Sequence, residues 1–345
     1  MKRPLFQIVL VLTLLALTIA PAQATSHVPQ GKASAGKIAI MTSPGGDIVL
    51  FDPATGKSQR ITDGMDPAFS PDGTKLAFTR WGVEPGLFVR DMRTGEERRV
   101  VRAEKPRHPS WSADGENLAF VRLLQTVDCR ESVLGCLTEE QLRLLFGGRD
   151  CARTPAGELC ISAMPIFKID QTGIATIGLD EQTWQDMPAP VDAQSVTWRP
   201  KSDELLFRGN NRLQITGPGR APTDVTRDVW WSSPVWSPDG ARFVAQQRIH
   251  DRIELGLFDA SGRFIQYLTR PATSFKRAPN NVAPAWSPDG KTILFLSDRD
   301  GGPGIWTLYR MNADGSGQAP FMPRAMKEIT IKYDFVAERV VSWSR

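Results

Sequence analysis

A repeated motif, an aromatic residue followed by Ser-Pro-Asp-Gly, constrains this chain more than any other feature. Full copies occur at Trp236–Gly240 and Trp286–Gly290, and each precedes an apolar run. Phe69–Gly73 begins with Phe, Trp111–Gly115 has Ala in place of Pro, and Trp198 is followed by Arg-Pro. Repeats with a period of about 20–50 residues are typical of propellers and solenoids.

Each repeat predicts two strands joined by a tight turn, because Pro presets φ, Asp bonds the backbone ahead of it, and Gly takes the positive φ. A second Asp/Asn…Gly turn follows in several repeats, for example between Asp52 and Gly56. Four short antiparallel strands per repeat make a propeller blade. The predicted structural anchors are Phe69, Trp111, Trp198, Trp236, Trp286 and Trp343, with turn aspartates Asp72, Asp114, Asp239 and Asp289.

The two ends of the chain predict how the ring of blades closes. Val340–Trp343 is the first half of the repeat without its turn, and Gly36–Ile40 resembles its second half. One blade is therefore shared between the ends, which gives six blades. We expect residues 335–343 to pair beside residues 37–42, leaving no open edge strand.

The interval between Trp111 and Trp198 is about twice the others and holds all four cysteines. We interpret residues 124–164 as an insertion in the third blade. Within it, Thr138–Gln141 followed by leucines predicts a capped short helix. Ile166–Asp170 and Ala175–Leu179 are both candidates for the third strand of that blade.

At these residues the chain resembles the TolB-like propellers, whose WD40-like repeat carries W-S-P-D-G before an apolar strand. Trp236–Gly240 and Trp286–Gly290 match in full, and Ser297–Gly301 resembles a loop that often follows the second strand in that family. The resemblance covers about residues 36–345 apart from the insertion. It implies an all-β, six-bladed propeller. The same repeat occurs in propeller halves of prolyl-oligopeptidase-type peptidases, so it predicts fold more than function.

The first 24 residues have the pattern of a signal peptide. Lys2 and Arg3 precede an apolar run over residues 5–20, and Ala22-Gln23-Ala24 supplies small residues at a cleavage site. The run is short for a membrane span, although an uncleaved anchor is the alternative. We therefore expect a signal peptide over 1–24, a short tail over 25–35, a propeller over 36–345, and export to the periplasm, the cell surface or the medium.

Four cysteines, all within the insertion, predict two disulfides. An even, clustered set in an exported protein is typical of disulfides. A zinc site is the rival, but the closely spaced cysteine pairs of such sites are missing. Three pairings are possible, and we favour the local ones because short loops close at the least entropic cost. The favoured bonds are Cys129–Cys136 and Cys151–Cys160.

The sequence offers little that predicts catalysis. It has no G-x-S-x-G nucleophile motif, and its three histidines, His27, His108 and His250, lack metal-ligand spacing. We therefore expect no catalytic residue, no metal and no cofactor. The net charge of +4 is spread without a basic run, which argues against nucleic-acid binding.

Four residues are tentative ligand contacts. Asp298 and Asp300 carry oxygen ligands that suit a cation, although a hairpin loop with an internal ion pair to Arg299 is the favoured interpretation. Trp230 precedes Trp231, and because adjacent strand residues face opposite ways, at most one of the two is a ligand platform.

Three functions follow in order of preference. The first is a non-catalytic, monomeric extracytoplasmic propeller that binds a protein or peptide partner. The second is a propeller that binds a carbohydrate or small molecule, and the third is a propeller lyase or hydrolase. Clustered acids with a cation would favour the enzyme, an aromatic groove the small-molecule binder, and a projecting, ordered insertion the protein binder.

Overall fold

The computed structural model describes residues 36–132, 135–154, 157–269, 278–321, 329–334 and 339–344. The predicted signal peptide and tail, residues 1–35, lie outside this part of the chain. Among the described residues, no helix has the length and apolar character needed to cross a membrane.

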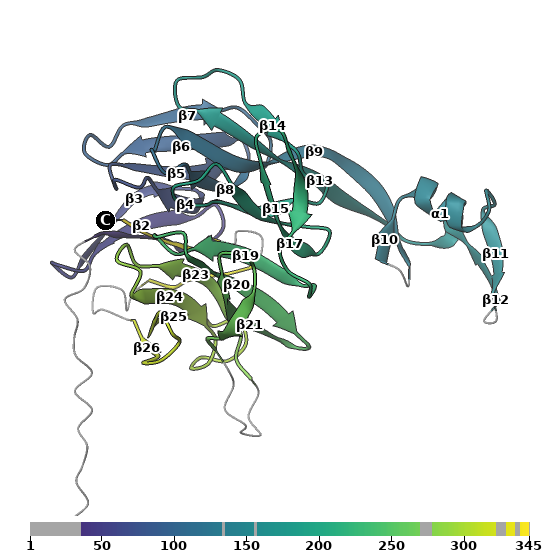
Figure 1. Ribbon diagram of the computed structural model, residues 1–345. Helices are drawn as coiled ribbons and strands as arrows, with labels where there is room; N and C mark the ends of the chain where they lie inside the picture. The colour runs from purple at the N-terminus through teal and green to yellow at the C-terminus, as the bar shows by residue number, and fades with distance from the viewer. Residues whose placement is uncertain are drawn as a thin grey trace, which may run out of the picture. The chain divides into compact units, whose positions relative to one another are not determined.

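Six antiparallel sheets form the six blades of a β-propeller, as the sequence predicts (Figure 1). The first blade consists of β27 (Val341–Trp343), β1 (Ile38–Met41), β2 (Asp47–Asp52) and β3 (Lys57–Asp63). The second consists of β4 (Met65–Phe69), β5 (Lys75–Arg80), β6 (Gly86–Asp91) and β7 (Glu97–Val101). The third consists of β8 (Arg107–Trp111), β9 (Asn117–Ser132), β13 (Ile166–Gly178) and β14 (Gln185–Met187).

The remaining three blades are regular four-stranded meanders. The fourth consists of β15 (Gln194–Trp198), β16 (Leu205–Gly209), β17 (Arg212–Gly217) and β18 (Arg220–Asp224). The fifth consists of β19 (Trp231–Trp236), β20 (Arg242–Ile249), β21 (Arg252–Asp259) and β22 (Phe264–Tyr267). The sixth consists of β23 (Asn281–Trp286), β24 (Thr292–Ser297), β25 (Thr307–Asn312) and β26 (Ala319–Pro320).

The first strands of the blades form a closed ring. The strands β27, β4, β8, β15, β19 and β23 each contact the first strand of the next blade, and β23 contacts β27. The second strands pack against them with apolar runs that are buried on both faces, such as Leu76–Phe78 and Ile293–Leu296. Unbroken apolar runs, rather than alternation, suit strands that are covered on both sides by neighbouring blades.

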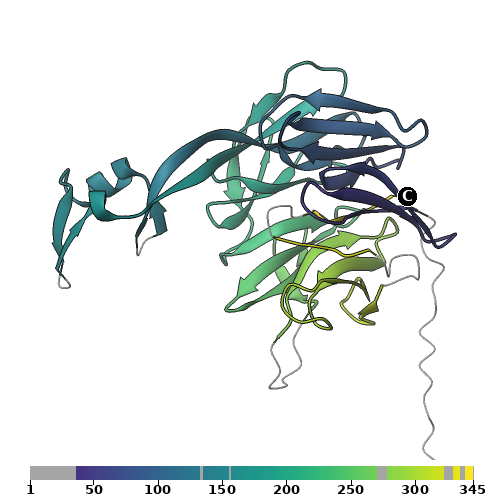
Figure 2. The same ribbon diagram turned by 180° about the vertical axis from the view of Figure 1, so that it is seen from behind.

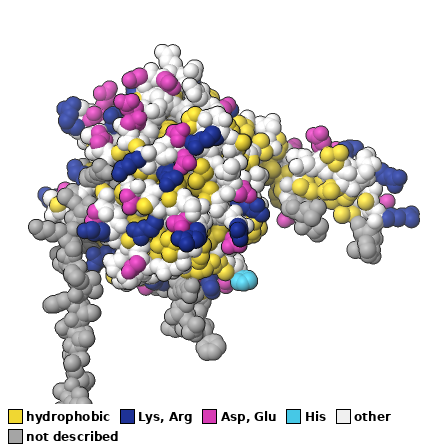
Figure 3. Space-filling model, in the orientation of Figure 1, with side chains coloured by type: hydrophobic (Ala, Val, Ile, Leu, Met, Phe, Trp, Pro, Cys, Tyr) yellow, Lys and Arg dark blue, Asp and Glu magenta, His cyan; other side chains and the backbone are white. Residues whose placement is uncertain are grey.

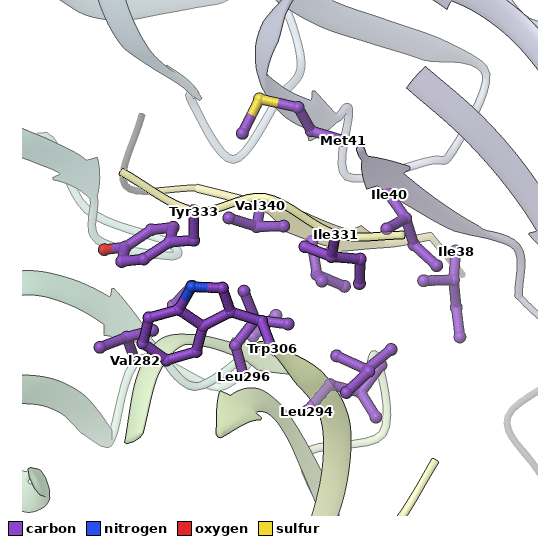
Figure 4. Packing of buried hydrophobic residues seen from close by; sticks show 14 of the residues in the cluster. Ile38, Ile40, Met41, Val282, Leu294, Leu296, Trp306, Ile331, Tyr333 and Val340 are labelled. Atoms are coloured by element: carbon purple, nitrogen blue, oxygen red, sulfur yellow. The ribbon is translucent and has the colours of Figure 1, made fainter. Parts of the chain in front are cut away.

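The first blade joins the two ends of the chain. β27 pairs antiparallel with β1, with Trp343 opposite Ile38, and the Met41 amide donates to the Val340 carbonyl at 2.9 Å. The buried cluster at this seam brings Ile38 and Ile40 together with Trp306 of the sixth blade (Figure 4). The predicted partner segment, residues 335–343, is described from residue 339 onward, and its described part lies beside β1.

The long insertion emerges between the second and third strands of the third blade. β9 and β13 stay paired from Asn117 to Arg130, with a register shift at Gln171/Thr172. We call residues 124–171, beyond this shift, the arm. Both predicted strand segments, Ile166–Asp170 and Ala175–Leu179, contribute to the single strand β13, because the ladder continues through the arm.

The arm carries its own small elements at the far end of the β9–β13 pair (Figures 1 and 2). They are β10 (Gly135–Leu137), α1 (Glu139–Leu145), β11 (Cys151–Thr154), β12 (Gly157–Cys160) and the 3-10 helix η1 (Ile161–Ala163). Thr138 caps α1 with the reciprocal Thr138–Gln141 bonds that the sequence predicts.

Candidate functional site

A pocket lies at the end of the ring where the first strands turn into the second strands. All six anchor aromatics contribute to its lining, together with four turn prolines, and its volume is about 440 Å³. The lining prolines of the turns are Pro71, Pro200, Pro238 and Pro288. We call this cavity the turn-face pocket. The sequence identified these residues as structural anchors, but only the closed ring of blades brings their side chains around one cavity.

The six anchor rings that line this pocket differ in burial. Trp111, Trp236 and Trp286 are buried, whereas the other three anchors are half-buried. Two indoles also connect neighbouring blades. Trp111 Nε1–H donates to the Ala68 carbonyl at 2.9 Å, and Trp286 Nε1–H donates to the Val235 carbonyl at 3.1 Å. Three of the six predicted anchors are therefore core residues, and the other three are partly exposed in the pocket.

The turn aspartates are engaged inside their own turns. In each turn, the Ser hydroxyl of the motif donates to the Asp carboxylate at 2.5–2.6 Å, and the same carboxylate accepts an amide two residues ahead. The four carboxylates are those of Asp72, Asp114, Asp239 and Asp289. The pKa values of these four carboxyl groups are lowered. The hydrogen bonds within each turn explain why Asp recurs at this position of the repeat.

Acid should destabilise the ring through these turns. Burial alone raises the pKa of Asp72, but hydrogen bonds from Ser70 and Thr74 outweigh it and bring the pKa to about 2, against 3.8 ordinarily. A carboxyl group whose pKa is lower in the folded protein than in the unfolded chain makes its full contribution to the free energy of unfolding above the unfolded pKa. This contribution is lost as the pH falls from about 4 towards 2. Urea unfolding at pH 5, 3 and 2.5 should show a shallower pH dependence for Asp72→Asn than for wild type. Ser70→Ala should act in the same direction, whereas an unchanged slope in Asp72→Asn contradicts the prediction.

A belt of bulges lies within the ring, three residues before five of the six anchors. Asp66, His108, Ser195, Ser233 and Ala283 have φ between 48° and 58°, and each lies at a register shift in its first strand. Asp66 accepts the His108 amide at 3.1 Å, and His108 Nδ1 accepts the Ser195 amide at 3.2 Å. These bonds connect successive blades. The repeat motif did not reveal this belt, although an X-Pro step recurs there in four repeats and is the signal that could have shown it.

The carboxylates of the Asp298–Asp300 loop are engaged by hydrogen bonds within the sixth blade. Asp298 accepts the Asn280 amide at 2.7 Å, and Asp300 accepts the Tyr309 hydroxyl, which, after desolvation, helps to raise the pKa of Tyr309 to about 12. Arg299 donates to Ser297 and Asn281 and stacks 4.4 Å from the Tyr309 centroid. In the described part of the chain it makes no ion pair with either aspartate, so the predicted internal pair is wrong. The loop instead supports strand packing in the sixth blade.

The adjacent residues Trp230 and Trp231 face opposite ways. Trp231 is 2% exposed and packs 4.7 Å from the Phe258 ring, whereas Trp230 is 56% exposed. The Trp230 backbone has φ of 72°, and its amide donates to the Asn211 carbonyl at 3.0 Å. Trp230 is therefore presented to solvent by a constrained backbone, away from the aromatic lining of the turn-face pocket.

The only candidate metal-ligand cluster in the described ranges is Asp150, Cys151 and Cys160. Its two cysteines form a disulfide, so their sulfur atoms are not thiolate ligands. The second disulfide joins Cys129 and Cys136. The structure thus contains the pairing that loop length favours.

The arm has a core of its own and an apolar surface. Leu142 of α1 is buried together with Ile161 and Met164. Figure 3 shows hydrophobic side chains gathered on this part of the molecule. The five most exposed large apolar side chains in the described part of the arm, which we call the arm patch, are Leu144, Leu145, Leu159, Ile166 and Phe167.

The base of the arm is fixed to the blades. Lys105, in the loop before β8, donates to Asp170 at 2.8 Å, and Thr126 donates to the same carboxylate. Together with the two disulfides, these contacts hold the arm patch on an ordered support.

Comparison with solved structures finds the same architecture elsewhere. TolB from Acinetobacter baumannii superposes with a TM-score of 0.62 at 16% identity, over 90% of this chain and 67% of that one. A TolB-type protein from Agrobacterium tumefaciens gives 0.55 at 15%, over 83% and 88%. A chain from a nidogen/laminin complex gives 0.56 at 11%, over 89% and 98%.

No family model and no curated protein matches the sequence. At the identities found, the structural likeness is one of fold. With six four-stranded blades, a first blade shared between the chain ends, and these matches, the protein has the fold of the TolB-like β-propellers.

Proposed function

We propose that this protein is a non-catalytic extracytoplasmic propeller that binds a protein or peptide partner through its arm. The observation that carries the proposal is the arm patch. Leu144 is 77% exposed, Ile166 58% and Phe167 46%, all within one ordered insertion. Large apolar side chains left exposed on a soluble protein mark interaction sites, and those of the arm are spread over more than one of its faces.

The disulfides and the small core that hold the arm patch in place favour a binding role over an insertion that has no function. Each disulfide closes a short loop, and the small core under α1 fixes the helix that presents Leu144 and Leu145. A preordered surface loses less conformational entropy when it binds. Ion pairs between Glu139 and Arg143 and between Asp128 and Lys168 provide charged groups near the patch.

The disulfides also support the proposed location. Disulfides persist in oxidising compartments and are rare in the cytosol. The described residues contain no free cysteine, in agreement with an extracytoplasmic site of action.

Removing the arm patch should abolish partner capture while leaving the ring folded. The test variant is Leu144→Ser with Phe167→Ser, compared with wild type for capture from the envelope fraction of its own source cells. Loss of two large anchors should weaken capture at least about tenfold, because a few large apolar contacts dominate most interfaces. The control is Trp198→Ala, which alters the turn-face pocket. Undiminished capture by the double variant contradicts the proposal.

A second candidate function rests on the turn-face pocket. Six aromatic residues around a cavity of about 440 Å³ suit a sugar ring or another flat ligand. The same variants decide between the two functions. Binding of a glycan panel that is lost in Trp198→Ala, but kept in the double arm variant, would assign the function to the pocket.

A further inference from the structure

The outer edge of β13 carries a stretch of strand with no neighbour among the residues that the structure describes. Further along, Ile174–Thr176 pair with β14, and the Thr172 amide donates to the Val191 carbonyl at 2.8 Å. Between Ile166 and Gln171, β13 pairs with β9 on its inner side only, as far as the described residues extend. The protein thus uses one half of this edge and leaves the other half open.

The direction of the open backbone groups follows from strand alternation. In an antiparallel strand, successive amides point to opposite edges. At the register shift Gln171 lies opposite Gln125 and Thr172 opposite Leu123, so the extra residue is in β9 and the alternation of β13 continues. Because the Thr172 amide points away from β9, those of Asp170, Lys168 and Ile166 point the same way. The Phe167 and Ile169 amides then point towards β9. The open edge therefore offers three outward amides in line with the bond that Thr172 already makes.

We propose that the Ile166–Gln171 edge binds an extended peptide segment of another polypeptide by strand addition. This inference rests on the proposed function and names how the arm holds its partner. A row of outward amides and carbonyls is complementary to another strand. The exposed side chains of Ile166 and Phe167 lie on opposite faces of the strand, so an added strand gains apolar contacts on both faces.

The charged residues of the Ile166–Gln171 edge favour pairing with a specific strand over aggregation with any exposed strand. Lys168 pairs with Asp128 at 3.0 Å, and Asp170 is held by Lys105. Lysine on an edge strand discourages aggregation between edges. Both charges have partners on the arm or at its base, so they leave the outward backbone groups open to an apolar strand.

The test uses a labelled peptide with the sequence of residues 123–130, Cys129 replaced by Ser, which copies the strand that pairs with β13 on its inner side. Anisotropy should show saturable binding to the wild-type protein. Lys168→Pro removes one outward amide but no bond to β9, because proline is tolerated where the amide faces solvent. We expect it to weaken binding about tenfold or more. The matched control, Lys168→Ala, keeps the amide and removes the same charge, and should bind like wild type.

A second measurement needs no variant. Hydrogen exchange of the wild-type protein should slow at the Lys168 and Asp170 amides when the peptide binds, with little change at Phe167 and Ile169, which already face β9. Absence of peptide binding, equal binding by the Pro and Ala variants, or protection spread evenly over both sets of amides would each overturn the inference. So would dimerisation of the wild type that Lys168→Pro abolishes, since the edge would then hold a second copy.

The outcomes separate this inference from the proposed function. If the Leu144→Ser, Phe167→Ser variant loses its partner while Lys168→Pro keeps it, the arm binds through side chains and strand addition is wrong. If neither variant affects partner capture, the proposed function fails as well.

Discussion

Deletion of residues 339–345 should make the chain aggregate and lose its cooperative unfolding transition. The deletion removes β27 and leaves the β1 edge unpaired. It also removes the Ser342 hydroxyl that accepts the Phe69 amide at 2.9 Å, and the reciprocal bonds between Ser344 and Lys37. An exposed, apolar edge strand such as Ile38–Met41 is a template for pairing between molecules. Size-exclusion chromatography and thermal unfolding followed by circular dichroism would measure both effects.

A rearranged chain provides the control for this deletion. Trp343 lies opposite Ile38, so the end of β27 adjoins the start of β1. Residues 339–344 joined through Asn-Gly to Lys37 of the truncated chain would form a two-residue hairpin, a favoured connection between antiparallel strands. This chain should recover the monomer and the cooperative transition. A truncated chain that is itself monomeric and cooperative would show that the shared blade does not close the ring.

Trp286→Ala should cost about 3–5 kcal/mol of unfolding free energy, the range for buried large aromatics. The indole is buried in the cluster that contains Val244 and Phe295, and its Nε1–H links the fifth and sixth blades through the Val235 carbonyl. The substitution removes both the packing and the link between blades. Urea unfolding monitored by circular dichroism gives the free energy.

Trp230→Ala is the matched control, because it removes the same side chain from a half-exposed position. Surface substitutions usually change stability by no more than about 0.5 kcal/mol. Similar losses of unfolding free energy in the two variants would mean that Trp286 contributes no more to stability than an exposed tryptophan.

The repeat made most of the fold predictable. Aromatic anchors, Pro-Asp-Gly turns and apolar runs are local patterns, and each one specifies a strand pair without reference to the rest of the chain. The half-repeats at Gly36–Ile40 and Val340–Trp343 predicted how the ends join. The short spacing between Cys129 and Cys136, and between Cys151 and Cys160, favoured the pairing that the structure contains.

The candidate sites were less predictable because their residues are assembled by long-range contacts. The roles of Asp298, Arg299 and Asp300 depend on Asn280, Asn281 and Tyr309, which reach them only through strand pairing and loop packing. The local charge spacing suggested an ion pair there. In the structure, Arg299 instead donates hydrogen bonds and stacks on Tyr309, and the two aspartates accept hydrogen bonds from other residues. The open edge of β13 was also hidden, since a sequence does not show where a strand loses its neighbour.

By itself the sequence determined the six blades, their turns, the shared first blade and the place of the insertion, because each depends on patterns within a single repeat or at a chain end. Only the tertiary structure decided that the anchors surround one pocket, that a belt of bulges links the first strands, and that the arm leaves six residues of β13 open on one edge. These features arise where separate blades meet or where a strand ladder ends. The contacts there form between residues that are distant in sequence, and only closure of the ring brings those residues together.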